Sequence, residues 1–265
     1  MSLLRNLKLT VAYDGSDFHG WQVQPALVTV QGTLAEVIGR TTGEKVLPQG
    51  SGRTDAGVHA LGQVVTFQTA SPIPIENLQI VLNDRLPPSI RVLQIEHMPD
   101  GFHARHSALR KHYQYRIYRG AIVPPFLHRY VTSHPYPLDE GAMTVAAEQV
   151  LGEHDFTSFA ASDPDRTARL SQGIDDDGGL LVKHATNIRT IFESRFERVH
   201  DELVYRVCGN GFLHHMVRNL VGTFLLVGKG TLKPEDVGRI LEARDRSAAG
   251  ATAPASGLYL VKVEY

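Results

Sequence analysis

The chain has 265 residues, of which 42% are hydrophobic and 21% are charged, and this composition excludes a disordered chain, a collagen and a coiled coil. No apolar run approaches the roughly 18 residues that a membrane helix needs, and the first ten residues lack the apolar core of a signal peptide. A single cysteine, Cys208, excludes an internal disulfide framework and a cysteine-rich zinc site. We therefore expect a cytoplasmic protein with no membrane partner.

The net charge of −1 conceals a segregation of charge along the chain. Residues 101–138 and 203–234 contain Lys and Arg but no Asp or Glu. Such stretches can form one basic surface that binds a polyanion, even in a protein that is neutral overall. The alternative is that folding brings acidic side chains back onto them.

In the first half, alternating apolar residues predict a strand over 7–13, and helical spacing predicts a helix over 30–38. The elements expected next are strands at 45–47 and 63–67, a helix over 75–82 and a strand over 90–96. The order β-α-β-β-α-β is typical of a ferredoxin-like split βαβ unit, with an antiparallel sheet and helices on one face.

The second half repeats this order with longer parts. The expected strands are 112–118, 187–199, 202–208 and 258–263, and the expected helices lie within 139–151, over 212–227 and after Pro234. We therefore predict an α+β fold in which two ferredoxin-like halves join antiparallel sheets into one platform with helices packed on one face. The predicted domains are 1–107 and 108–265, with an exposed polar loop near 161–180.

The segment 49–60, QGSGRTDAGVHA, is too rich in glycine to serve packing. Glycine allows the backbone to bend sharply and to approach a ligand closely. Asp55 within it is either a turn residue that bonds a nearby N–H or a reactive carboxylate. Arg53 adds a clamp for a phosphate or a base, and this pairing suits reactions on nucleotides.

The core of this segment, SGRTDAGVHA at 51–60 followed by Gly62-Gln63-Val64, resembles the catalytic loop of tRNA pseudouridine synthases of the TruA type. Five further stretches agree, in family order: 13–15 with 20–22, 102–105, 113–115, 212–219, and 252–254 with 257–260. The resemblance covers nearly the whole chain. His106 and Ser89 depart from the family pattern, which usually shows an aromatic residue and an Asp there.

The resemblance implies that the chain isomerises uridine to pseudouridine in the anticodon stem-loop of tRNA, at tRNA positions 38, 39 and 40, without a cofactor. The reaction breaks the N1–C1′ bond, turns the base and rejoins it through C5. Asp55 matches the family's catalytic aspartate; whether it attacks C1′, attacks C6 or removes the 2′ proton stays open. Arg218 matches the arginine that pairs with that aspartate. Tyr113 matches a tyrosine that stacks on the base and is a candidate to help remove the C5 proton.

Further residues are expected to bind the substrate. Arg53 would steady a nucleotide flipped out of its stem, and Arg105, Arg110 and Lys111 would contact the RNA. The resemblance also implies a homodimer bridged by one tRNA.

Purely structural roles are the alternatives for several of these residues. Tyr113 shares a strand face with Tyr115 and could belong to the core, and Arg218 could be an ordinary basic residue. His103, His106 and the pair His214-His215 lack the Cys or Glu partners of a zinc site, so no metal is expected. Trp21 and Cys208 are expected to pack in the core.

Two other function classes fit the sequence less well. A non-catalytic RNA-binding module would share the sheet and the basic stretches, but it would have no use for the carboxylate of Asp55. A metal-assisted nuclease needs two or more clustered carboxylates, and this loop holds one.

Overall fold

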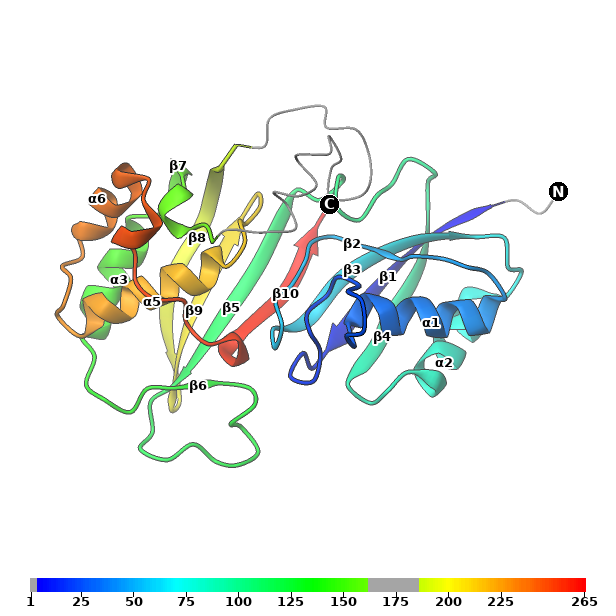
Figure 1. Cartoon of the computed structure of the whole chain (residues 1–265), viewed down its shortest axis with the longest axis horizontal. Helices are drawn as coiled ribbons and strands as arrows, with labels where there is room; N and C mark the ends of the chain where they lie inside the picture. The colour runs from blue at the N-terminus through cyan, green and yellow to red at the C-terminus, as the bar shows by residue number, and fades with distance from the viewer. Residues whose placement is uncertain (1–3, 162–185) are drawn as a thin grey trace. The chain divides into compact units, whose positions relative to one another are not determined.

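The computed structural model describes residues 4–161 and 186–265 (Figure 1). Two compact units make up the chain: the first comprises Met1–Ile117, Val123–Ser133 and Ala255–Tyr265, and the second comprises Tyr118–Ile122 and His134–Pro254. No helix within the described residues is long and apolar enough to cross a membrane. The polar loop expected near 161–180 lies, apart from residue 161, outside the described residues. The expected domain boundary after residue 107 stays a prediction.

The strands of the first unit begin with a split βαβ arrangement. They are β1 (Arg5–Tyr13), β2 (Gln49–Gly50), β3 (His59–Thr69), β4 (Ile90–Met98), β5 (Arg110–Tyr118, the last residue being in the second unit), β6 (Thr132–Ser133) and β10 (Leu258–Glu264). β1 pairs antiparallel with β3 and β4, and β2 pairs antiparallel with β3. The resulting order β4-β1-β3-β2 confirms the ferredoxin-like prediction for the N-terminal half.

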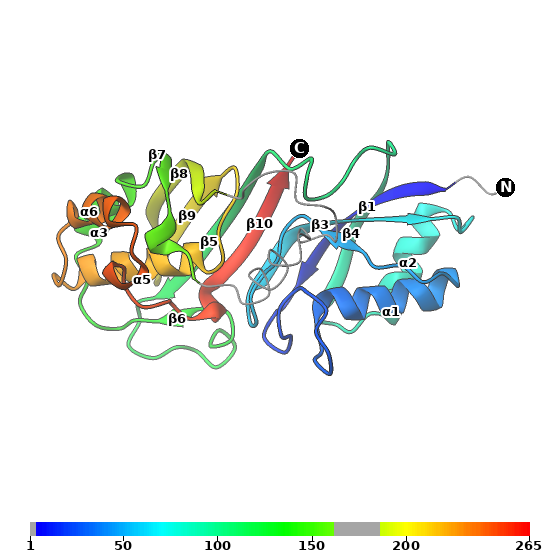
Figure 2. The ribbon, with the colours of Figure 1, turned by 45° about the horizontal axis from the view of Figure 1, so that its top comes forward.

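Two helices complete this half, α1 (Val30–Thr42) and α2 (Ile75–Arg85). α1 begins where the Thr29 hydroxyl accepts a hydrogen bond from the Gly32 amide, and it ends at Gly43, whose φ of 75° suits a left-handed cap. The helices pack against each other and lie on the same side of the strands (Figure 2). Apolar residues of β1 and α1, such as Leu9 and Leu34, are fully buried in this core.

One edge of β3 is shared by two strands. β2 pairs with its second half at Val65 and Thr66, whereas β10 pairs with its start, Tyr259 opposite His59 and Leu260 opposite Ala60. β10 runs antiparallel to β5, so strands of both halves of the sequence join in one sheet here. The ladder between β10 and β3 is parallel, so the platform formed by the antiparallel strands of the two halves is a mixed sheet at this junction.

The described residues of the second unit form an antiparallel set of strands and three helices. The strands are β7 (Gly152–Asp155), β8 (Ile188–Val199) and β9 (Glu202–Gly209); the helices are α3 (Glu140–Glu148), α5 (Met216–Gly228) and α6 (Asp236–Ala243). α3 packs on α5 and on β8. The rings of Tyr205 and Phe224 are 5.3 Å apart and anchor this core. Short 3-10 turns lie at Thr157–Phe159, Arg246–Ala248 and Ala255–Gly257.

Two local predictions fail for identifiable reasons. Residues 45–47 form no strand; pairing begins only after Pro48, which has no N–H to donate to a ladder. The long helix begins at Met216 rather than at 212, because His215 adopts a left-handed backbone with φ 59° that no α-helix can contain. The sequence also did not indicate the short strands β6 and β7.

Candidate active site

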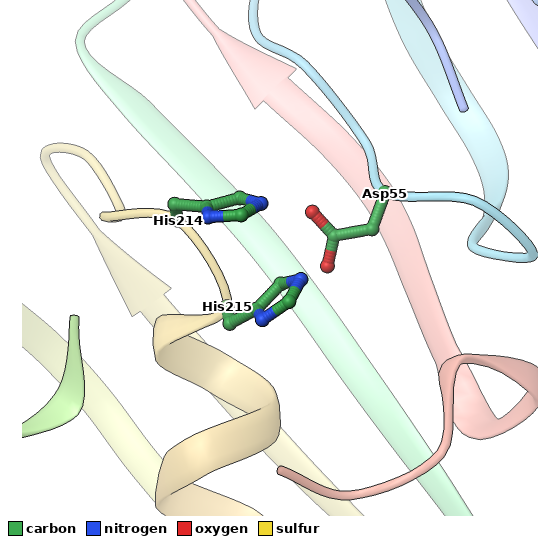
Figure 3. Close-up of side chains that lie close together, drawn as sticks. All are labelled: Asp55, His214 and His215. Carbon is green, nitrogen blue, oxygen red and sulfur yellow. The ribbon is translucent and has the colours of Figure 1, made fainter. Parts of the chain in front are cut away.

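Asp55 lies on the loop between β2 and β3, residues 51–58, which we call the Asp loop (Figure 3). The loop starts where the Ser51 amide donates to the Val64 carbonyl oxygen at 2.8 Å, and it ends in a tight turn in which the Val58 amide donates to the Asp55 carbonyl oxygen at 3.1 Å. Asp55 is partly exposed, so its carboxylate is accessible to a ligand.

Thr54, next to Asp55, is held from two directions. The Tyr13 hydroxyl and the Thr54 hydroxyl are 2.8 Å apart, and the Trp21 amide donates to the Thr54 carbonyl oxygen at 3.0 Å. Burial raises the pKa of Tyr13 to about 12, so this hydroxyl stays protonated at neutral pH. Trp21 is 2% exposed, which confirms it as a packing residue. These contacts fix the backbone that carries Asp55.

Two glycines before the loop allow this close packing. A Cβ atom on Gly15 would lie 1.9 Å from the Val58 carbonyl oxygen, and one on Gly20 would lie 2.7 Å from the Thr54 carbonyl oxygen. Gly20 also has a φ of 85°, which favours glycine. Both glycines belong to stretches that carry the family resemblance, and the structure shows that they cradle the Asp loop.

Gln63 and Lys111 support the start of the loop. Gln63 accepts from the Ser51 hydroxyl at 2.6 Å and donates to the Gly52 carbonyl oxygen at 2.8 Å. Lys111 Nζ donates to the Ser51 carbonyl oxygen at 2.6 Å. The contact of Lys111 with RNA that the sequence led us to expect stays a prediction, and the structure gives this side chain a second role in the loop.

Tyr113 lies on β5 opposite Leu260 of β10, and its side chain is 8% exposed. Burial raises the pKa of Tyr113 well above its ordinary value, and the nearby Tyr13 and the negative charge of Asp55 raise it further. The ring therefore lies within electrostatic reach of the Asp55 carboxylate and carries a neutral phenol at neutral pH. Tyr115, two residues on, is fully buried and bonded to Thr132 at 2.6 Å.

Arg218 lies in the first turn of α5, in the second unit. Its Nε donates to the Ala253 carbonyl oxygen at 2.8 Å, and the Ala253 amide donates back to the Arg218 carbonyl oxygen at 3.1 Å. A Cβ atom on Gly222, one turn later, would lie 1.8 Å from the Ala251 carbonyl oxygen. Residues 251–253 thus lie directly on α5 and orient the Arg218 guanidinium.

His214 and His215 stand immediately before α5, with ring centroids 4.0 Å apart (Figure 3). His214 is exposed, and its carbonyl oxygen accepts from the Ala161 amide at 3.0 Å. The left-handed backbone of His215 is costly for a residue with a side chain, and such strain concentrates at functional sites.

The remaining expected substrate contacts lie in the first unit. Arg53, on the Asp loop, and Arg105 are partly buried, whereas Arg110 is exposed at the start of β5. The backbone amide of Arg105 donates to His103 Nδ1 at 3.1 Å. The roles of all three toward RNA stay predictions.

Folding returns some acidic side chains to the acid-free stretches. Ion pairs form between Arg119 and Glu140 at 3.3 Å, Arg129 and Asp17 at 2.5 Å, and Arg206 and Glu197 at 2.6 Å. The charge segregation along the sequence therefore overstates the basic surface of the folded protein.

Comparison with known proteins identifies the family. A family model described as tRNA pseudouridine synthase matches residues 9–107 and 180–265, which include Asp55 and Arg218. The chain belongs to the tRNA pseudouridine synthase family. It is 49% identical over 262 residues to tRNA pseudouridine synthase A of Solibacter usitatus, covering 99% of this chain and 100% of that protein. The enzymes of the same name from Brevibacillus brevis and Lacticaseibacillus casei are each 43% identical over 99% of this chain and 100% of their own length. The resemblance seen in the sequence is thereby confirmed.

Several residues that shape the Asp loop of this synthase were not singled out from the sequence. Tyr13 and Gln63 lie within the stretches that carry the resemblance, so their position in the sequence is the one signal that could have found them. The contact between Lys111 and Ser51 spans 60 positions and leaves no local pattern.

Proposed function

We propose that the chain isomerises uridine to pseudouridine in the anticodon stem-loop of tRNA, at tRNA positions 38, 39 and 40, with Asp55 as nucleophile or base. Membership of the tRNA pseudouridine synthase family supports tRNA uridine as the substrate. The observation that carries the residue assignment is the Asp loop itself: contacts from Tyr13, Trp21 and Gln63 fix its backbone while Asp55 stays partly exposed.

Tyr113 provides the flat partner that a flipped base needs, because an aromatic ring can stack on any base. Its phenol, neutral at neutral pH, can donate a hydrogen bond or relay a proton, but it is a poor base by itself. We infer that it stacks on the reacting uracil and takes part in moving the C5 proton with the help of a second group.

Arg218 is inferred to compensate the charge of Asp55 when RNA is bound. A carboxylate in a site closed against water is costly unless a cation accompanies it. The bond from Arg218 Nε to Ala253 supports this role, because it fixes the direction of the guanidinium. Arg53, Arg105, Arg110 and Lys111 are inferred to contact the RNA.

We further propose that the protein acts as a cytoplasmic homodimer in which one tRNA contacts both subunits. Sedimentation at micromolar concentration checks this: a 58 kDa species is expected, about twice the 29.2 kDa of one chain. A fully active monomer would contradict it.

The catalytic assignment is tested by Asp55→Asn, which removes a charge with little change of shape. Release of tritium from C5-labelled uridine in tRNA transcripts should be abolished, while tRNA affinity and melting temperature stay close to those of the unmutated protein. Asp84→Asn, at an exposed position on α2, is the matched control. Turnover by Asp55→Asn within about tenfold of the unmutated rate, a barrier change of about 1.4 kcal/mol, would remove Asp55 from the chemistry.

A further inference from the structure

Three consecutive backbone carbonyl groups, those of residues 129–131, accept hydrogen bonds from side chains of other segments of the first unit. In order, the donors are His59 at 3.1 Å, Tyr259 at 2.7 Å and Ser256 at 3.2 Å. Residues 129–131 precede the short strand β6. We call them the latch segment, because side chains rather than a strand ladder hold this backbone in place.

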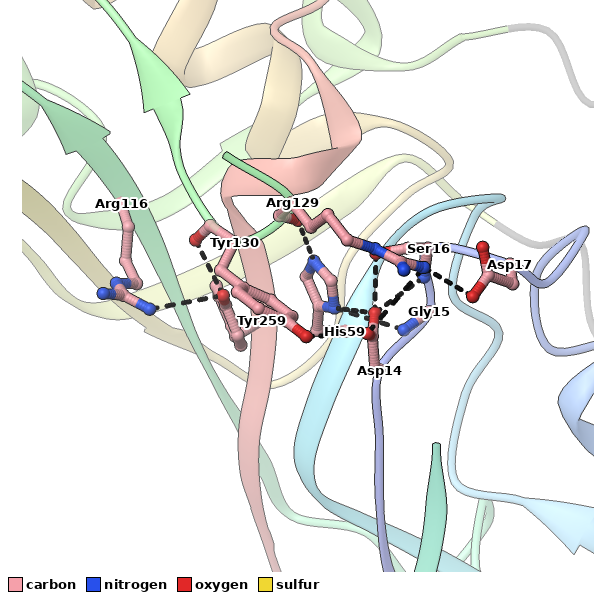
Figure 4. Close-up of polar contacts among 9 residues, drawn as sticks. All are labelled: Asp14, Gly15, Ser16, Asp17, His59, Arg116, Arg129, Tyr130 and Tyr259. Carbon is pink, nitrogen blue, oxygen red and sulfur yellow. Dashed lines mark hydrogen bonds and ion pairs between the residues drawn. The ribbon is translucent and has the colours of Figure 1, made fainter. Parts of the chain in front are cut away.

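Two side chains of the latch segment bond in the other direction, to the turn that follows β1 (Figure 4). The Tyr130 hydroxyl donates to Asp14 Oδ2 at 3.0 Å, and the Arg129 guanidinium pairs with Asp17 at 2.5 Å. Asp14 also accepts from the amide and the hydroxyl of Ser16 at 2.9 and 2.6 Å. The latch segment is therefore tied to the residues that cradle the Asp loop.

His59 lies at the centre of this network and is 2% exposed. The Gly15 amide donates to His59 Nδ1 at 3.1 Å, so Nδ1 must carry a lone pair. Nε2 then carries the proton and donates it to the Arg129 carbonyl oxygen. Both contacts agree with one neutral tautomer, and the ring stacks on Tyr259 with centroids 4.7 Å apart.

Burial keeps His59 neutral near pH 7, because it is the largest cause of the lowered pKa of His59, and the positive charge of Arg116 lowers that pKa further. The negative charge of Asp14 and the hydrogen bonds to the backbone of Arg129 and Ser256 oppose this shift without reversing it. For Asp14, burial favours the protonated carboxyl, but the hydrogen bonds from Ser16 and Tyr130 outweigh it and hold the pKa below its usual value. Asp14 is thus ionised, with Oδ1 3.2 Å from His59 Nδ1.

His59 is also the residue that directly follows the Asp loop. Its partner Gly15 has no room to move toward the loop, because a Cβ there would lie 1.9 Å from the Val58 carbonyl oxygen. The Val58 amide in turn closes the turn onto Asp55. A shift of the imidazole therefore displaces the end of the Asp loop.

We propose that neutral His59 is a positioning residue that joins the latch segment and the Gly15 turn to the Asp loop and so fixes the Asp55 carboxylate. This inference rests on the proposed function of Asp55. Protonation of Nδ1 removes the acceptor of the Gly15 amide and turns the new N–H toward Asp14, which loosens the end of the loop as the pH falls.

Two variants of His59 each keep one of its two hydrogen bonds, either the bond to the Arg129 carbonyl oxygen or the bond from the Gly15 amide. His59→Gln can place its NH2 group at the position of Nε2 and donate to the Arg129 carbonyl oxygen, but it has no acceptor at the position of Nδ1. His59→Asn can place its oxygen at the position of Nδ1 and accept from the Gly15 amide, but it is too short to reach the Arg129 carbonyl oxygen. Tritium release from C5-labelled tRNA gives kcat and KM for both variants across pH 5 to 8. Amide hydrogen exchange over residues 51–58 reports the order of the Asp loop.

We expect kcat of both variants to fall about tenfold or more, with KM for tRNA within about twofold and faster exchange in the Asp loop. The acid side of the kcat profile should become less steep, because one titrating group has been removed. Values of kcat within twofold of the unmutated protein, or an acid limb of unchanged steepness, would overturn the proposal.

If the His59 variants do not fold, Tyr130→Phe tests the proposal instead, because it removes only one hydroxyl group from the network around His59. A fall in kcat of about threefold or more at constant KM supports the proposal, and an unchanged kcat overturns it. Tyr136→Phe, at a site that is 70% exposed in the second unit, is the matched control. An unmutated protein that forms no pseudouridine would instead overturn the proposed function, and this inference with it.

Discussion

Lys111 Nζ donates a 2.6 Å hydrogen bond to the carbonyl oxygen of Ser51, the first residue of the Asp loop. Lys111 and Tyr113 are two residues apart on β5, so their side chains lie on the same face of the strand. On one face of β5, Lys111 therefore supports the Asp loop and Tyr113 presents its aromatic ring.

Lys111→Met should lower kcat by about tenfold or more, because the Ser51 carbonyl group loses its donor and the Asp loop loses a support. Arg110→Gln, at the neighbouring exposed position, should weaken tRNA binding and leave kcat within about twofold. Filter binding and saturating-substrate kinetics separate the two effects. If Lys111→Met changed affinity alone, Lys111 would be a contact for RNA and not a support for the loop.

Tyr113→Phe should lower the rate by about 10² if the hydroxyl takes part in proton transfer, since the ring itself is retained. Because burial and Asp55 raise the pKa of Tyr113, its neutral form persists above pH 10, the ordinary value for tyrosine. A role that needs the neutral phenol is therefore fully present at neutral pH and is lost only as the pH rises through that elevated pKa. Rates measured from pH 7 to 10 check this. A Tyr113→Phe protein as fast as the unmutated one would leave the residue as a stacking platform.

Arg218→Ala should reduce the rate by several orders of magnitude, because the Asp55 carboxylate would lose the cation proposed to compensate its charge. Arg218→Lys should restore little of the lost activity. Lysine has a single ammonium group, so it cannot donate to the Ala253 carbonyl oxygen and also present a planar guanidinium, which it lacks. Single-turnover release of tritium from C5-labelled tRNA measures the rate of each variant. A rate for Arg218→Ala within about tenfold of the unmutated rate would refute the proposed pairing of Arg218 with Asp55.

The salt dependence of tRNA binding tests the basic contacts. Each phosphate contact contributes about −0.7 to −0.9 to the slope of log K against log salt, so the double variant Arg105→Gln with Arg110→Gln should flatten the slope by about 1.4 to 1.8. The control double variant replaces Arg239 and Arg244, which pair with Asp236 and Asp155, and should leave the slope nearly unchanged. Equal slopes for the two double variants would place the RNA elsewhere.

The sequence predicted the elements of this fold well where one periodicity runs over many residues. β1, α1 and α5 bury regular apolar patterns, and each was found within a few residues of its observed bounds. The prediction at 45–47 failed because three residues carry too little pattern and because Pro48 delays the pairing. The parallel ladder between β10 and β3 joins residues about 200 positions apart, and no local signal specifies it.

The candidate site likewise has one part that the sequence indicated and one part that it did not. Asp55 could be singled out as a candidate because its neighbours form an unusual run of glycine and polar residues that also carries the family resemblance. The network of His59 could not, because its partners Asp14 and Tyr130 come from distant segments and meet only after folding. The geometry of such side chains depends on tertiary packing, and a single sequence has no local pattern from which these contacts could be predicted.

The placement of β10 in the first unit has a consequence for how the protein is made on the ribosome. Residues 1–117 emerge long before residues 255–265, yet β10 provides the neighbour of both β3 and β5, and Tyr259 provides the ring on which His59 stacks. During translation the edge of β3 beside the Asp loop therefore stays unpaired while the intervening second unit is synthesised. The nascent chain cannot complete its first unit until β10 has left the exit tunnel, so this unit is finished only after the second unit has been synthesised.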